Sequence, residues 1–153
     1  MTQEFQKPFT SPPTIFSVAL VLGLLIGWLM PWRVLPLPLQ LILGPLLIAA
    51  GVFVIWRSIQ DIETAGTTYD PYSASTALVT AGVYRHSRNP GYLGLAIIQF
   101  GVAILLDNLW IVGTGIIAVL VTSHFVIRLE ERKLTRAFGD PYTSYMQQVR
   151  RWL

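Results

Sequence analysis

The stretch RHSRNPGYLG, residues 85–94, gathers charged and polar side chains just before an apolar run. Asn89 is a good helix N-cap and Pro90 a good first helical residue, so a helix is predicted to begin here with free backbone amides in its first turn. A helix N-terminus carries partial positive charge, and Arg85 and Arg88 add full charges beside it. These residue types at this spacing predict an anion-binding site.

Small and aromatic residues surround the same turn. Gly91 and Gly94 lack side chains, so a ligand or another helix can approach the backbone closely there. Tyr84 and Tyr92 supply aromatic faces that can hold a cation or an adenine ring. The same residues also fit an ordinary membrane boundary, with arginine and tyrosine as interfacial anchors and glycine for helix packing. From these residues alone, both interpretations stand.

A second group of chemically active side chains lies in HFVIRLEERKLTRAFG, residues 124–139. At helical spacing, His124, Arg128 and Glu131 share one stripe, and Glu130 lies on the neighbouring face. Both glutamates are candidate proton acceptors or partners for a cation. Pairing with the basic residues around them on a solvated helix surface explains the two acids equally well.

The elements that must position these groups are apolar helices. The chain has 153 residues, of which 53% are hydrophobic and 12% charged, and its mean hydropathy is +0.55. Such a composition is typical of a membrane protein, in which ~20 apolar residues cross ~30 Å of hydrocarbon as a helix. We therefore predict an all-α integral membrane protein, one domain over residues 1–153, with four transmembrane helices at about 14–32, 37–57, 90–106 and 109–128.

The fourth of these helices is predicted to continue past the membrane. The continuation, from His124 onward, holds no Gly or Pro before Gly139, a plausible C-cap, so the helix should extend about three turns into the cytoplasm. The cytoplasmic tail, residues 129–153, should end in a short amphipathic helix over residues 141–153, with Asp140 as its N-cap. Its apolar face is expected to pack on the cytoplasmic end of the bundle.

The positive charges predict the orientation in the membrane. Four spans place ten of the eleven Lys and Arg residues on the side of the two termini, and only Arg33 on the other. The positive-inside rule then puts both termini in the cytoplasm. The ten residues are Lys7, Arg57, Arg85, Arg88, Arg128, Arg132, Lys133, Arg136, Arg150 and Arg151.

Composition also excludes several classes of function. The chain has no cysteine, so thiol catalysis, disulfides and thiolate metal sites are excluded. Two histidines without a metal-ligand spacing make a dedicated metal site an unfavourable hypothesis. The net charge of +3 follows from basic residues near the span ends, and no basic groove with interleaved aromatics indicates a nucleic-acid partner.

Two segments together carry a resemblance to a known family. LVTAGVYRHSRNPGYLG, residues 78–94, followed by EERKLTRAFGDPYTSYMQQVRRWL, residues 130–153, resembles the paired signature of the integral-membrane isoprenylcysteine carboxyl methyltransferase and phospholipid methyltransferase superfamily. In that family a Leu-Val-Thr-x-Gly-x-Tyr run leads to Arg-His-Pro-x-Tyr-x-Gly at the start of a span. A Glu-Glu pair and Phe-Gly-x-x-Tyr-x-x-Tyr follow.

This resemblance implies a methyltransferase that uses S-adenosyl-L-methionine, bound at the cytoplasmic ends of the last spans and the tail. By position, Arg128, Glu130 and Glu131 would lie toward the cofactor's amino-acid part or the substrate. One departure from the family pattern is Asn89, which stands where the family commonly has His and cannot accept a proton near neutral pH. The residues implied to bind the cofactor are Leu78, Val79, Tyr84, Arg88, Asn89, Pro90, Gly91 and Tyr92.

The methyl acceptor stays open at this stage. The resemblance implies a hydrophobic or amphipathic acceptor at the cytoplasmic membrane face, such as an isoprenylcysteine-like carboxylate or a lipid amine. A carboxylate acceptor needs no base, whereas an amine or thiol must lose a proton, for which Glu131 or Glu130 is the candidate. The alternatives are methylation of a small thiol or amine, or a non-enzymatic membrane scaffold or pore. The oligomeric state is left undetermined.

Overall fold

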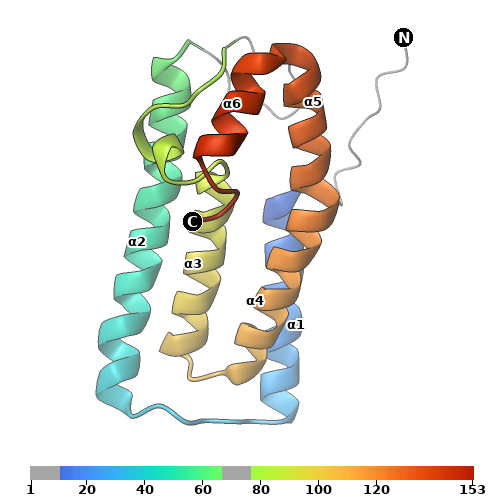
Figure 1. Cartoon of the computed structure of the whole chain (residues 1–153). Helices are drawn as coiled ribbons and strands as arrows, with labels where there is room; N and C mark the ends of the chain where they lie inside the picture. The colour runs from blue at the N-terminus through green and yellow to red at the C-terminus, as the bar shows by residue number, and fades with distance from the viewer. Residues whose placement is uncertain (1–10, 67–76) are drawn as a thin grey trace.

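A computed structural model describes residues 11–66 and 77–153, and the described parts are helical without any strand. Lys7, one of the basic residues used for the orientation, lies outside them. Figure 1 shows the long helices side by side as a bundle. In chain order the elements are α1 (Pro12–Leu29), α2 (Leu37–Thr64), η2 (Gly82–Arg85), α3 (Pro90–Leu105), α4 (Leu109–Val121), η3 (Thr122–Ile127), α5 (Arg128–Phe138) and α6 (Asp140–Gln148).

Three helices in the described parts are long and apolar enough to cross a membrane. They are α1 with 18 residues, α2 with 28, and the 30-residue run Leu109–Phe138 formed by α4, η3 and α5. Helix α3 is also apolar but has only 16 residues. Large apolar side chains such as Ile42, Leu46 and Leu120 are about 60% exposed, which water would penalise and lipid would not. The chain is therefore a multi-pass membrane protein.

The run Leu109–Phe138 begins at a capped helix end. The Asn108 side-chain oxygen accepts hydrogen bonds from the amides of Trp110 at 3.0 Å and Ile111 at 3.4 Å. The run ends where Gly139 takes a φ of +60°, in the region that glycine adopts most easily. Within it, the six residues Thr122–Ile127 form a π-helix, which the sequence did not predict. Such wide turns interrupt α-helices mostly at functional sites.

Glycines bring α2 and α3 into backbone contact. A Cβ on Gly94 would lie 2.8 Å from the carbonyl oxygen of Gly51, and one on Gly51 would lie 2.7 Å from the carbonyl oxygen of Gly94. Distances this short leave no room for any side chain at either position. Gly94 therefore serves the approach of another helix, one of the two uses expected for it, and this contact fixes where α3 begins.

The end of the bundle away from α6 is closed by one carboxylate. Asp107, in the turn between α3 and α4, accepts hydrogen bonds from the backbone amides of Val34 at 2.9 and 3.0 Å and Leu35 at 3.0 Å. These amides belong to the connection between α1 and α2 (Figure 1). Asp107 is only 5% exposed, so this carboxylate is an internal clamp between the two connections.

The expected helix over residues 141–153 is shorter than predicted. Helix α6 ends at Gln148, and Val149 is extended, with φ −120° and ψ 132°. Periodicity suggests a continuous amphipathic helix, but the carbonyls of residues 150 and 151 instead accept hydrogen bonds from the turn just before α3. The N-terminal part of the predicted apolar face does pack against the rest of the protein, because Tyr142 and Tyr145 are buried.

Candidate functional site

The two segments singled out from the sequence meet at the α5 and α6 end of the bundle. The Tyr92 hydroxyl, in the first turn of α3, donates a hydrogen bond to Glu130 Oε1 of α5 at 2.6 Å. The guanidinium of Arg88 lies 3.1 Å from Glu131 Oε1. Residues about 40 positions apart in sequence are thus joined by one hydrogen bond and one ion pair.

Arg151 completes this cluster, and the sequence did not single it out as a site residue. Its guanidinium contacts both oxygens of the Glu131 carboxylate, with Nε 3.0 Å from Oε1 and Nη2 2.6 Å from Oε2. This two-point geometry is the strong form of an arginine–carboxylate pair. No local pattern could have revealed it, because the partners are 20 residues apart and Arg151 lies beyond the last helix.

The backbone of residues 150 and 151 also holds the turn that precedes α3. The amide of Arg88 donates to the carbonyl of Arg150 at 3.0 Å. The carbonyl of Arg151 accepts from the Asn89 side-chain amide at 3.0 Å and from the Ser87 hydroxyl at 3.3 Å. The turn, α5 and the extended segment 149–153 therefore form one connected polar unit.

Asn89 does not cap α3 in the way the sequence predicted. It stands at the N-cap position, but its side chain makes no capping hydrogen bond because it donates to Arg151 instead. Pro90 and Gly91, in the first turn, are buried. The reason is tertiary: the segment 149–153 lies against this end of α3 and supplies acceptors that a sequence pattern does not show.

The remaining predicted cofactor-binding residues lie in the chain leading to this turn. Leu78 and Val79 are half-buried in the extended stretch before η2, outside the polar cluster. Tyr84, within η2, accepts a hydrogen bond at its carbonyl from the buried Tyr145 hydroxyl at 2.6 Å. Arg85 and His86 are exposed. Arg88 is therefore the arginine of this stretch that joins the acids.

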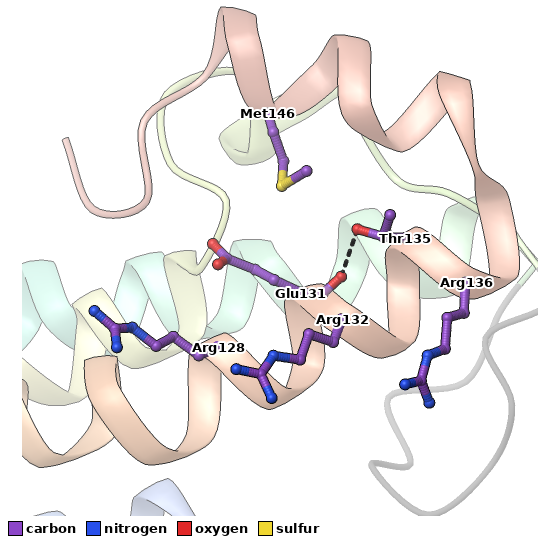
Figure 2. A pocket seen from close by; sticks show the side chains of 6 residues that line it. All are labelled: Arg128, Glu131, Arg132, Thr135, Arg136 and Met146. Carbon is purple, nitrogen blue, oxygen red and sulfur yellow. Dashed lines mark hydrogen bonds between the residues drawn. The ribbon is translucent and has the colours of Figure 1, made fainter.

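An open groove adjoins the cluster along α5. Its volume is about 520 Å³, within the range of small-molecule sites. Figure 2 shows Met146 of α6 facing α5 across it, with three exposed arginines along α5. Glu131 belongs to both the cluster and the groove. The lining residues are Arg128, Glu131, Arg132, Thr135, Arg136 and Met146.

Burial controls the protonation of the groups around this cluster. Desolvation raises the pKa of Glu130 above its ordinary value of 4.5, and the hydrogen bond from Tyr92 opposes that rise. Desolvation likewise raises the pKa of the Tyr142 hydroxyl, an effect that neighbouring Glu131 reinforces. Burial thus favours the neutral form of Glu130 more than water does.

Both arginines of the cluster converge on one of its two acids. Two guanidinium groups, of Arg88 and Arg151, share the single carboxylate of Glu131. The Arg88 side chain is only 11% exposed, and its Nε is buried without a hydrogen-bond partner among the described residues. A buried donor without an acceptor costs free energy unless a ligand supplies one. These residues fit a ligand that bears a carboxylate.

Comparison with known families gives one match over most of the chain. The profile of the family described as phospholipid methyltransferase matches residues 39–141 of the 153. That range includes α2, α3, α4 and α5 together with the polar cluster, except for Arg151. No solved structure matches the chain.

Several curated proteins are similar to parts of the chain. The protein-S-isoprenylcysteine O-methyltransferase of Schizosaccharomyces pombe is 36% identical over 47% of this chain and 30% of its own length. Protein-S-isoprenylcysteine O-methyltransferase A of Arabidopsis thaliana is 31% identical over 72% of this chain and 54% of its own length. The chain thus spans about a third to a half of these relatives. An uncharacterized protein of Haemophilus influenzae is 42% identical over 40% of this chain and 98% of its own length.

Proposed function

The chain belongs to the phospholipid methyltransferase family, and we propose that it is an integral membrane methyltransferase that uses S-adenosyl-L-methionine to methylate a hydrophobic or amphipathic acceptor. The observation that carries this proposal is the contact between the turn before α3 and the two acids of α5. Tyr92 bonds to Glu130, and Arg88 pairs with Glu131. These two contacts bring aromatic, guanidinium and carboxylate groups together. S-adenosyl-L-methionine has an adenine ring, a carboxylate and an ammonium group that these can bind.

The proposed topology has four crossings and both termini in the cytoplasm, within one domain over residues 1–153. Helix α3, with 16 residues, is about 24 Å long, so its crossing requires the flanking turns to lie in the interfacial regions. The basic residues near Arg88 and along α5 support a cytoplasmic position for the cluster, in line with the positive-inside rule. That is the side from which a cytosolic cofactor enters.

The proposed cofactor site uses the buried Nε of Arg88, which has no partner among the described residues. Through this donor Arg88 would hold the cofactor's carboxylate, and Glu130 would face its ammonium group. Tyr84 and Tyr92 offer aromatic surfaces near the sulfonium and adenine. Leu78, Val79, Pro90 and Gly91 supply apolar and side-chain-free walls, and Asn89 holds the turn in place through Arg151. When bound, the cofactor supplies an electrophilic methyl group.

The groove beside the cluster is the proposed acceptor site. Arg128, at one end of its three-arginine row, suits an acidic headgroup, and Met146 suits an apolar chain. An isoprenylcysteine-like carboxylate would attack the methyl group without losing a proton, so positioning and water exclusion would supply most of the catalysis. For a lipid amine, Glu130 is the better proton acceptor, because two arginines already hold Glu131.

A methyl-transfer assay tests this proposal. Purified protein in nanodiscs receives S-adenosyl-L-methionine with a radiolabelled methyl group, together with isoprenylcysteine analogues, total membrane lipids and small thiols as competing acceptors. We expect label in the isoprenylcysteine or lipid fraction, and its loss in Tyr92→Ala. Label in the thiol alone would favour the small-acceptor alternative. Absence of label in every fraction, with no binding of S-adenosylhomocysteine at millimolar concentration, would leave a non-enzymatic scaffold.

A further inference from the structure

Arg151 is bonded to both halves of the candidate cofactor site. Its guanidinium holds the Glu131 carboxylate at 2.6 and 3.0 Å, and its carbonyl accepts from Asn89 at 3.0 Å. We propose that Arg151 is a positioning residue, which sets the affinity for the cofactor by fixing Glu131 relative to the turn before α3. This inference rests on the proposed function and assigns a role to a residue that the sequence analysis did not place in the cofactor site.

The need for a second arginine follows from the geometry at Glu131. Arg88 contacts only Oε1 of this carboxylate, at 3.1 Å, which leaves the carboxylate free to rotate about its side chain. The two-point contact with Arg151 removes that freedom. It also relieves Arg88 of neutralising Glu131 alone, so the buried Nε of Arg88 stays available to a ligand. Arg151 thus fixes the orientation of the Glu131 carboxylate and leaves the Nε of Arg88 available to a ligand.

The side chain of Arg151 is separable from the folding of its segment. Residues 149–153 are also held by the Trp152 indole, whose Nε1 donates to the Ser123 hydroxyl at 2.9 Å. The backbone bonds from Arg88 and Asn89 do not involve the guanidinium. A substitution of Arg151 therefore leaves three ties in place, and the segment should remain docked.

The neighbouring Arg150 provides a matched control. Both residues are arginines in the same extended segment, but the Arg150 side chain is exposed, while that of Arg151 is 31% exposed and paired. Arg150 contributes its carbonyl to the Arg88 amide, and a side-chain substitution retains that bond. Replacement of either arginine by Gln changes the net charge equally, so long-range electrostatic effects cancel in the comparison.

The test is calorimetric titration of the detergent-solubilised full chain with S-adenosylhomocysteine, the demethylated cofactor. We expect Arg151→Gln to weaken binding about tenfold, the scale of one charge-assisted hydrogen bond, and Arg150→Gln to leave it within about twofold. Arg151→Lys keeps the charge without the two-point geometry and should recover part of the loss. The melting temperatures of the three variants serve as the control for folding.

A double-mutant cycle with Glu131→Gln separates positioning from mere stabilisation. If Arg151 acts through Glu131, then Arg151→Gln adds no further loss of affinity in the Glu131→Gln background. Additive losses, or unchanged or tighter binding by Arg151→Gln, would overturn the inference while the wild-type chain still binds. If the wild-type chain binds no S-adenosylhomocysteine, the proposed function fails and this inference fails with it.

Discussion

Each end of the bundle is held by a carboxylate, that of the buried Asp107 at one end and that of the partly buried Glu131 at the other, and the two have different partners. Asp107 binds the backbone amides of Val34 and Leu35, which are neutral donors. At the other end, Glu131 binds the charged side chains of Arg88 and Arg151. Both contacts join segments far apart in sequence, so both stabilise the fold.

The two ends differ in their unpaired hydrogen-bond donors and in the volume of the adjoining pocket. At the Asp107 end, two amides and one carboxylate satisfy one another, and the adjoining pocket has about 190 Å³. At the Glu131 end, two guanidinium groups share one acid, a buried donor of Arg88 has no partner among the described residues, and the groove has about 520 Å³. In a purely structural contact every buried donor has an acceptor, whereas a binding site leaves donors unpaired until the ligand supplies the acceptor.

The largest expected effect is on stability, at the Asp107 end. Asp107→Ala leaves the amides of Val34 and Leu35 without their acceptor and places alanine at φ 45°, so it should cost about 3 kcal/mol, or about 10 °C in melting temperature. Thermal unfolding followed by tryptophan fluorescence measures this loss. Asp107→Asn, which keeps one acceptor oxygen and tolerates the positive φ, should lose less than half as much.

If the two ends are independent, Asp107→Ala also leaves the affinity for S-adenosylhomocysteine unchanged when measured below its melting temperature. A weakening of more than about threefold would show that the clamp and the site are coupled.

The second effect concerns the helix contact between the two ends. Gly51→Ala introduces a Cβ 2.6 Å from Ile98 and 2.7 Å from the carbonyl of Gly94, so α2 and α3 must separate at a cost of about 2 kcal/mol. The matched control is Gly113→Ala in α4, where a Cβ meets nothing within 4 Å and the stability should be unchanged or slightly higher. Equal melting temperatures for the two variants would refute the close packing of α2 and α3.

A smaller effect is expected at the site itself. Tyr92→Phe removes the hydroxyl that donates to Glu130 and keeps the ring, so S-adenosylhomocysteine binding should weaken about tenfold, equivalent to about 1.4 kcal/mol. Calorimetric titration measures the change. A variant with full affinity but a lower melting temperature would assign the Tyr92–Glu130 bond to folding alone, as at the Asp107 end.

The smallest effect is a dependence of stability on pH. Burial raises the pKa of Glu130 in the folded protein, so the folded state binds this proton more tightly than the unfolded state. Stability should therefore fall as the pH rises from the ordinary value of 4.5 through the raised pKa, and no further above it. Melting temperatures measured across this range should show that Glu130→Gln lacks this decrease. An identical decrease in wild type and variant would assign it to another group.

Much of the fold follows from local sequence rules. The apolar runs locate the long helices, and the absence of Gly or Pro between Gly115 and Gly139 predicts that the helix from Leu109 continues to Phe138. The meeting of Tyr92 with Glu130 is consistent with the paired family signature, which places both segments near one cofactor. Periodicity and composition suffice here because each helix is defined by its own residues.

The parts that could not be predicted depend on contacts between distant residues. Asn89 is a good cap by its type, yet Arg151 takes its side chain. The amphipathic pattern after Asp140 continues through Val149, yet α6 ends at Gln148 because the next residues bond to the turn before α3. The pairing of Glu131 with Arg88 and Arg151, in place of its helix neighbours, has the same origin. Local helix interactions contribute only a few tenths of a kcal/mol each, so stronger hydrogen bonds and ion pairs between distant residues override them.

The most direct test of the central claim is titration of the wild-type chain with S-adenosylhomocysteine, beside the two carboxylate variants Asp107→Asn and Glu131→Gln. We expect saturable binding with one site per chain, retained by Asp107→Asn and weakened at least tenfold by Glu131→Gln. Equal affinities for all three proteins, or no binding by the wild type at millimolar ligand, would contradict the claim that the Glu131 end of the bundle is the cofactor site.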